Sequence, residues 1–356
     1  MQLKEVRARK ILNSRHEETI EILIDTARGR VFAAAPSGKS RGKYEAEPFS
    51  SKGIDFSITL ANAMGRRLVA DKISFGSFDD LKKFENIAKG YDSSKNWGLI
   101  GGNVVFAMEA AILKAIAQSN NQDLWQFLNP SAKQLPFPVG NCIGGGAHVK
   151  KDKKPDIQEF LLIPSAKHFI DAQFINLHCY KEAKREILKA DKDWKGEITD
   201  ENAIAPSLPT EKILDILKKV SYTVGEKFKT DIMLGIDMAS STLLKYGKYS
   251  YLNPKSDKTS DEQIDFVLQL IEDYSLFYVE DPLEEEDFEG FSKLTEKAKC
   301  MIVGDDLTAT QPERLQRAID SRSVNAVIVK PNQNGSLLET KRFVDLAHKN
   351  RIQTII

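Results

Sequence analysis

The sequence predicts an α/β protein, a barrel of parallel strands preceded by a smaller α+β domain. Two observations support this prediction. Before about residue 130, strand-like segments are followed by a block of helical segments, and beyond it short apolar runs alternate with helical stretches. The first order is typical of an α+β domain and the second of a parallel sheet. We expect domains at residues 1–130 and 131–356, joined near Leu135–Pro138, whose prolines exclude a helix.

The smaller domain begins with strands. Two runs rich in β-branched or small apolar residues, Ile20–Ile24 and Val31–Ala35, flank the turn-forming residues 27–29. A turn-rich loop, PSGKSRG, begins at Pro36. Apolar residues at intervals of three and four then predict helices at Ile58–Val69, Phe78–Ile87 and Asn103–Gln118.

Five short apolar runs predict the strands of the second domain. They do not alternate with polar residues, which is typical of strands buried on both faces. The runs are Phe160–Ile163, Ile232–Ile236, Leu276–Val279, Met301–Val303 and Ala326–Val329, and the predicted helices are Lys212–Lys227, Asp261–Glu272, Pro312–Ile319 and Leu337–Lys349. A parallel sheet of this kind is doubly wound or closed. No Gly-rich dinucleotide loop follows any run, so we favour the barrel.

Composition restricts the possible classes of function. Lys plus Arg equals Asp plus Glu, at 51 each, so no net charge attracts nucleic acid or anionic lipid. The three cysteines have no paired spacing, which argues against a disulfide framework and a thiolate zinc site. No apolar run approaches the roughly 20 residues that span a bilayer, and no signal peptide is evident. We therefore expect a cytoplasmic protein whose partners are neither nucleic acids nor membranes.

Ionisable residues follow four consecutive apolar runs. Asp237 follows IMLGI, Glu280 and Asp281 follow LFYV, Asp305 follows MIVG, and Lys330 follows AVIV. Barrel enzymes place catalytic groups at the C-terminal ends of their strands, so we expect these side chains to converge. Helix capping is an alternative explanation for any single acid, but it explains four consecutive strands poorly.

Converging carboxylates predict a site for a hard cation, magnesium or calcium. Lys330 would lie beside this cation. The positive charge, together with desolvation, would lower the pKa of the lysine and make its neutral amine available as a base. A metal ion and an amine base are suited to removing a weakly acidic proton next to a carboxylate.

Nine segments resemble sequence blocks of the enolase family, in the family's order and over nearly the whole chain. They are SRHEETIEI from residue 14, PSGKSRGKYEA from 36, GGGAHVKK from 144, DIQEFLLIP from 156, TDENAIAP from 199, GIDMASS from 235, YVEDPLEEED from 278, GDDLTATQP from 304 and VIVKPNQNGSL from 327. Proton removal by an amine base beside magnesium is the known pattern of this superfamily. The resemblance implies an enolase-type barrel, magnesium-dependent dehydration of 2-phosphoglycerate, and a homodimer.

The resemblance also implies roles for the metal-binding residues and the base. Asp237, Glu280 and Asp305 match the ligands of a first magnesium ion. Ser40 matches the serine that helps to hold a second. Lys330 matches the base that takes the proton from carbon 2 of the substrate.

The acid and the substrate contacts are implied in the same way. Glu201 matches the general acid for the departing hydroxyl, with Glu159 beside it. Paired carboxylates suit this task, because one raises the pKa of the other and keeps a proton available. Substrate-binding positions are matched by His148, Gln158, Glu159, Glu280 and Asp305.

Three departures from the family pattern concern its loops. Lys39 and Arg41 stand on either side of Ser40 where the family has small residues, and Asn202 and Ala203 replace two glycines after Glu201. The SRHEET block stands where the family commonly has Gly-Asn-Pro. Glycine permits backbone conformations that side chains restrict, so the departures affect loop geometry and turnover more than fold. Two alternatives stay open: another acid dehydratase or racemase of the superfamily, and a non-catalytic relative.

The segment RIQTII, residues 351–356, predicts the beginning of a further strand. In enolases a Ser-His-Arg-Ser stretch that binds the substrate phosphate comes next, followed by a second active-site lysine on the last strand. The 356 residues contain neither. We expect a fragment with unpaired sheet edges that aggregates and shows no dehydratase activity, even with saturating magnesium.

Overall fold

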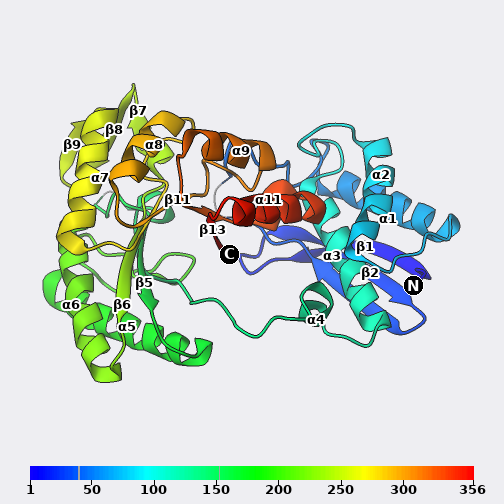
Figure 1. Cartoon of the computed structure of the whole chain (residues 1–356), viewed down its shortest axis with the longest axis horizontal. Helices are drawn as coiled ribbons and strands as arrows, with labels where there is room; N and C mark the ends of the chain where they lie inside the picture. Colours follow the sequence, from blue (N-terminus) through cyan, green and yellow to red (C-terminus); the bar gives the residue numbers. More distant parts are fainter. Residues whose placement is uncertain (39–40, 152) are drawn as a thin grey trace.

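The structure is a computed structural model that describes residues 1–38, 41–151 and 153–356 (Figure 1). Its N-terminal part contains an antiparallel sheet in the order β1-β2-β3, formed by β1 (Glu5–Leu12), β2 (Glu18–Thr26) and β3 (Gly29–Ala34). The helices that follow are α1 (Ile54–Ala70), α2 (Leu81–Tyr91), α3 (Gly102–Ser119) and α4 (Leu124–Leu128). Helix α3 packs on β2 and β3, and α1 packs on β1. The predicted order of strands and then helices is confirmed.

The second part is a curled seven-stranded sheet with helices outside it (Figure 1). In spatial order its strands are β13 (Gln353–Ile355), β12 (Ala326–Ile328), β11 (Met301–Gly304), β10 (Tyr278–Glu280), β6 (Ile232–Asp237), β5 (Glu159–Pro164) and β4 (Gly140–Gly144). The helices are α5 (Phe169–Ala190), α6 (Thr210–Phe228), α7 (Ser260–Tyr274), α8 (Phe288–Lys297), α9 (Pro312–Ser321), α10 (Pro331–Asn334) and α11 (Leu337–Lys349). A small sheet of β7 (Leu244–Lys245), β8 (Lys248–Leu252) and β9 (Lys255–Lys258) lies beside α7. The α/β barrel class predicted from the sequence is confirmed.

The expectation of a wholly parallel sheet was wrong. From β6 to β13 the neighbouring strands are parallel, but β5 runs antiparallel to both β4 and β6. Two helices that pack together, α5 and α6, connect β5 to β6. A helical pair returns the chain to the end of the sheet where it left, so the next strand runs in the opposite direction. Strand β4 was not predicted, because its GNCIG sequence lacks a continuous apolar run.

Buried apolar residues explain why the barrel strands show no period of two. On β5, Phe160 and Leu162 belong to the large core beneath the helices, whereas Leu161 and Ile163 belong to a small cluster on the other face of the sheet. Both faces are therefore buried. A separate core lies between the first sheet and its helices. The domain boundary at residue 130 stays a prediction.

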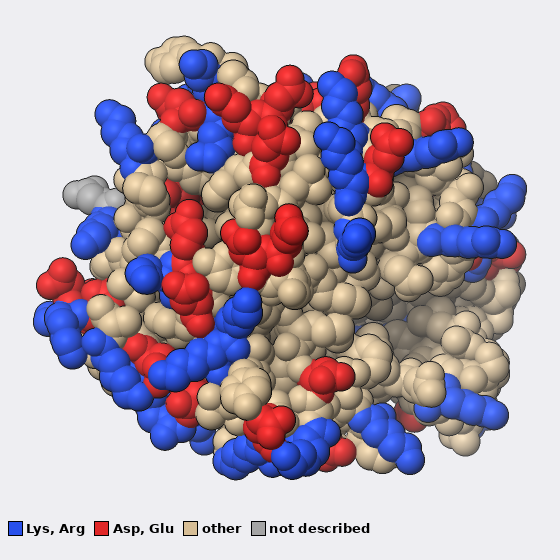
Figure 2. All heavy atoms as spheres, turned by 60° about the vertical axis from the view of Figure 1, so that its left-hand side comes forward, with Lys and Arg blue, Asp and Glu red and all other residues tan. Residues whose placement is uncertain are grey.

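Among the described residues, no helix combines the length and the apolarity that crossing a bilayer requires. Figure 2 shows Lys and Arg interspersed with Asp and Glu over one face of the molecule. This mixture matches the balanced charge of the sequence.

Candidate active site

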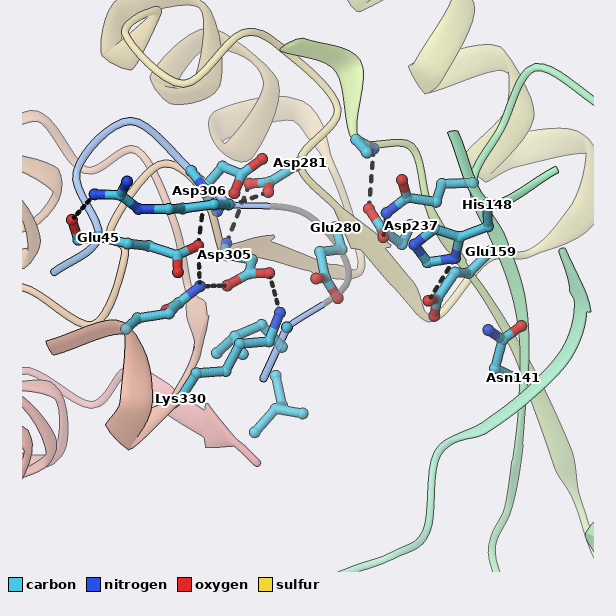
Figure 3. Close-up of a pocket in the computed structure, with 18 of the residues that line it drawn as sticks. Glu45, Asn141, His148, Glu159, Asp237, Glu280, Asp281, Asp305, Asp306 and Lys330 are labelled. Carbon is cyan, nitrogen blue, oxygen red and sulfur yellow. Dashed lines mark hydrogen bonds and ion pairs between the residues drawn. The ribbon is translucent and has the colours of Figure 1, made fainter. Parts of the chain in front are cut away.

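Strand register places the predicted carboxylates in a row. Glu280 at the end of β10 lies opposite Asp237 of β6, and Asp237 lies opposite Glu159 of β5. On the other side of β10, Glu280 lies opposite Val303 of β11, two residues before Asp305. Figure 3 shows these carboxyl groups in a row that runs across a pocket, from Asp305 through Glu280 and Asp237 to Glu159.

The pocket has a volume of about 780 Å³ and is lined by both parts of the chain. The N-terminal part contributes Arg15, Ser37 and Glu45. Ser40 lies outside the described residues, so its predicted role stays a prediction. All other predicted site residues line the pocket: His148, Gln158, Glu159, Glu201, Asp237, Glu280, Asp305 and Lys330.

Three carboxylates are close enough together to share one cation. One oxygen from each of Glu280, Asp281 and Asp305 lies within 4.8 Å of the other two. Sequence analysis did not propose Asp281 as a ligand. Its two carboxyl oxygens accept hydrogen bonds from the backbone N–H groups of Asp305, at 3.1 Å, and Asp306, at 2.8 Å. Asp281 thus fixes the chain that carries Asp305.

Asp237 lies beside this group of three rather than within it. One of its oxygens accepts from Nε2 of Gln158 at 3.0 Å, and the other accepts from the backbone N–H of Ala239 at 2.9 Å. The structure therefore brings Glu280 and Asp305 together and adds Asp281 as a candidate. The predicted ligand set of Asp237, Glu280 and Asp305 stays a prediction.

The carboxylates of the pocket are buried and repel one another. Burial, followed by the charges of Asp237 and Asp305, raises the pKa of Glu280 well above its usual range. Burial is also the main reason why the pKa of Asp237 rises to about 6 and that of Asp306 to about 7. Oxygen ligands with excess negative charge suit a hard divalent cation.

Lys330 lies next to this group (Figure 3). Its ammonium donates to one oxygen of Asp305, and Nε2 of Gln333 donates to the other at 3.0 Å. Burial on its own lowers the pKa of Lys330, but the charges of Asp305, Glu280 and Asp237 outweigh this effect and raise it. The expected lowering of this pKa concerns a lysine beside a bound cation and stays a prediction, since without a cation the carboxylates surround Lys330 with negative charge.

A second cluster of ionisable residues comes from strand β5 and two loops. Nδ1 of His148 is 3.7 Å from Oε1 of Glu159 and 3.9 Å from Oε2 of Glu201. Burial, with the charges of Asp237 and Glu201, raises the pKa of Glu159 to about 8. Glu159 therefore retains a proton near neutral pH, as a pair of carboxylates in one site requires.

Close backbone packing fixes the loop that carries His148. A Cβ atom on Gly145 would lie 2.4 Å from the carbonyl oxygen of Ile157, and Gly146 has a φ of 48°. The Gly145 N–H donates to the carbonyl oxygen of Gln158 at 2.9 Å. Only glycine permits this close approach, which holds His148 and Gln158 on the same side of the pocket.

Sequence analysis missed two further polar residues of the pocket. Nδ2 of Asn141 is 3.5 Å from Oε2 of Glu201, but β4, which carries Asn141, has no strand signal. Oε1 of Glu45 accepts from the N–H of Gly42 at 2.8 Å, and burial raises the pKa of Glu45. A glutamate in a polar loop offers no local signal of burial.

Comparison with known proteins covers almost the whole chain. Residues 3–128 match a family model described as the enolase N-terminal domain, and residues 132–356 match the enolase C-terminal TIM barrel domain. Proteins named enolase from Methanosphaera stadtmanae and Methanothermobacter thermautotrophicus are each 38% identical over 99% of this chain, covering 86% and 85% of their own lengths. An enolase from Thermoplasma acidophilum is 32% identical over 97% of the chain and 84% of its own length.

Proposed function

Because the chain belongs to the enolase family, we propose that it catalyses the magnesium-dependent dehydration of 2-phosphoglycerate to phosphoenolpyruvate, a step of glycolysis and gluconeogenesis. One observation carries the proposal. Figure 3 shows Lys330, Glu280 and Asp305 on one side of the pocket and Glu159 and His148 on the other. Glu201 lies beside this second pair, because its Oε2 is 3.9 Å from Nδ1 of His148. A base and an acid thus flank one space, as the removal of a proton and a hydroxyl from neighbouring carbons requires.

The cluster of carboxylates in the pocket suits a magnesium ion. Glu280 and Asp305, with Asp237 or Asp281 beside them, would hold the ion through carboxylate oxygens. The raised pKa of Glu280 supports this assignment, because it results from burial first and from the charges of Asp237 and Asp305 next, and a bound cation would offset both effects. When bound, magnesium stabilises the negative charge that the substrate carboxylate gains as the carbon-2 proton leaves.

Lys330 is the base of the proposed reaction. Its Nζ takes the proton from carbon 2, and the electron pair of the broken C–H bond delocalises into the substrate carboxylate. To accept this proton the amine must first be neutral, although the surrounding carboxylates raise its pKa. Positive charge close to Asp305 and Glu280 opposes their effect on the lysine and lowers this pKa again.

Glu201 is the acid of the proposed reaction. It gives its proton to the hydroxyl on carbon 3, the C–O bond breaks, and water leaves as the double bond between carbons 2 and 3 forms. The pKa of Glu159 is about 8, so this carboxyl group stays uncharged near neutral pH. It therefore does not repel the carboxylate that Glu201 becomes when it gives up its proton. His148 lies between the two carboxyl groups and orients them.

The proposal extends to location and partners. We propose a cytoplasmic homodimer whose partner is a small phosphorylated acid, with no role for nucleic acid or membrane. The balanced charge of the chain, 51 basic and 51 acidic residues, supports the last point.

The test is the formation of the conjugated enol phosphate from 2-phosphoglycerate, followed by ultraviolet absorbance with and without magnesium. Because this chain covers 86% of the length of the Methanosphaera stadtmanae enolase, we would assay both this chain and the chain extended with the C-terminal segment of that protein. Magnesium-dependent turnover by the extended chain supports the proposal. A folded extended chain that binds magnesium without turnover would favour another superfamily reaction or a non-catalytic role.

A further inference from the structure

Arg15 connects the N-terminal part of the chain to the loop that carries Glu201. Its Nε lies 3.0 Å from Oδ2 of Asp200, and its Nη2 lies 3.8 Å from Oε1 of Glu201. The third nitrogen, Nη1, donates to the carbonyl oxygen of Ser37 at 2.8 Å. One guanidinium therefore contacts two segments that are far apart in the sequence, and only 23% of the Arg15 side chain is exposed.

A tight turn between β1 and β2 directs Arg15 towards the barrel. The side-chain oxygen of Asn13 accepts from the backbone N–H groups of Arg15, at 2.8 Å, and Glu17, at 3.0 Å. The backbone N–H of Asn13 donates to the carbonyl oxygen of Glu17 at 2.9 Å. His16, at the tip, has a φ of 61°. The hydrogen bonds of the turn thus fix the backbone of Arg15 independently of the contacts that its side chain makes.

The loop around Glu201 is closed by hydrogen bonds of its own backbone and of the Thr199 hydroxyl, which accepts from the N–H groups of Glu201 and Ala203. The N–H of Thr199 donates to the carbonyl oxygen of Ala203 at 2.9 Å, and the N–H of Asn202 donates to that of Thr199 at 3.0 Å. The Glu201 side chain is 37% exposed, more than those of His148, at 5%, and Glu159, at 21%. Burial therefore restrains the side chain of Glu201 less than those of His148 and Glu159.

Arg15 and Asn141 lie near different oxygens of the same carboxyl group. Arg15 lies at Oε1 of Glu201, and Nδ2 of Asn141 lies 3.5 Å from Oε2. A guanidinium is planar and stays charged at any working pH, so it orients a carboxylate without competing for its proton. Its simultaneous bond to Asp200 restrains the backbone on which Glu201 stands.

We propose that Arg15 is a positioning residue for Glu201, holding residues 199–203 and the Glu201 carboxyl against the N-terminal part of the chain. The inference rests on the proposed function in one respect, namely that Glu201 is the acid. The geometric part is independent of it. Arg15 belongs to the SRHEET block, whose departure from the family pattern begins only after this residue.

Hydrogen–deuterium exchange with mass spectrometry tests the proposal on both the 356-residue chain and the extended chain. Arg15→Met keeps the length and the apolar stem of the side chain but removes its charge and its hydrogen bonds. Arg15→Lys restores the charge. Arg30→Met is the matched control, because Arg30 also forms an ion pair in the N-terminal sheet, with Asp25 at 2.6 Å, but does not line the pocket.

In Arg15→Met we expect exchange in residues 195–205 to become roughly tenfold faster, because a charged hydrogen bond no longer opposes local opening. Arg15→Lys should recover part of this protection, and Arg30→Met should leave the segment as in the wild type. Wild-type exchange in Arg15→Met would overturn the proposal, as would equal effects of Arg15→Met and Arg30→Met. Exchange reports on the loop and not on turnover, so a failure of the proposed chemistry leaves this result unchanged.

Discussion

Replacing Glu159 by Gln should change how the stability of the protein depends on pH. The pKa of Glu159 is about 8 in the folded protein, against an ordinary value of 4.5, because the carboxyl group is buried and faces Asp237 and Glu201. The unfolded chain therefore loses this proton at lower pH than the folded one. The contribution of Glu159 to stability is fully present below pH 4.5 and is lost as the pH rises towards 8.

The magnitude follows from the width of this range. Between the two pKa values, one such group lowers the free energy of unfolding by about 1.4 kcal/mol for each pH unit. At pH 7 the loss from Glu159 amounts to about 3 kcal/mol. Gln has nearly the same shape and cannot ionise, so the variant lacks this dependence. Asp237 and Asp306, whose pKa values rise to about 6 and 7, add slopes of their own that both proteins share.

Urea unfolding, followed by circular dichroism at several pH values in a chelating buffer without magnesium, measures the effect. The quantity to plot is the difference in free energy of unfolding between variant and wild type, which should grow in favour of Glu159→Gln from pH 5 to pH 8. Glu289→Gln is the control, because that side chain is 84% exposed. If the curves for Glu159→Gln and wild type run parallel over this range, Glu159 is not a buried acid with a raised pKa.

Three further predictions concern magnesium binding at Glu280, the base Lys330, and Asn202 in the loop that carries Glu201. Magnesium at about 100 times its Kd should stabilise the wild type by about 2.7 kcal/mol, and Glu280→Gln should lose most of this gain in a thermal scan with and without the ion. In the extended chain, Lys330→Ala should slow exchange of the carbon-2 proton by about 10²–10⁴-fold or more while substrate binding stays detectable by calorimetry; wild-type exchange would remove Lys330 from the mechanism. Asn202→Ala should destabilise the protein by about 1 kcal/mol in urea unfolding, because the φ of 65° is costly for alanine, whereas Asn202→Gly should not.

The convergence of the site could be predicted because it depends on strand ends. Asp237, Glu280 and Asp305 each follow an apolar run, and parallel neighbouring strands bring such positions to one edge of a sheet. Lys330 likewise follows an apolar run, whereas Glu159 was placed by resemblance to the enolase family, and both line the same pocket. The positions at strand ends follow from the local sequence and from the rule that neighbouring parallel strands end at the same edge of a sheet.

The parts that could not be predicted depend on contacts distant in the sequence. Asp281 was expected near the other strand-end acids, but nothing in the local sequence shows that its carboxyl oxygens accept hydrogen bonds from the N–H groups of Asp305 and Asp306. The strength with which Asp305, Glu280 and Asp237 raise the pKa of Lys330 depends on distances between strands, which the local sequence does not give. The direction of β5 depends on the pairing of α5 with α6, which apolar periodicity does not reveal.

The loop departures have a common physical explanation that bears on whether the site can work. His16 and Asn202 stand where the family commonly has glycine, and both adopt a left-handed backbone, with φ of 61° and 65°. Asparagine and histidine are among the residues that tolerate this conformation best, so the chain keeps the turn without the glycine. Ala203 is fully buried, and its N–H donates to the Thr199 hydroxyl at 3.1 Å. Both loops therefore form tight turns without these glycines, and Arg15 of the first loop lies 3.8 Å from Glu201 of the second.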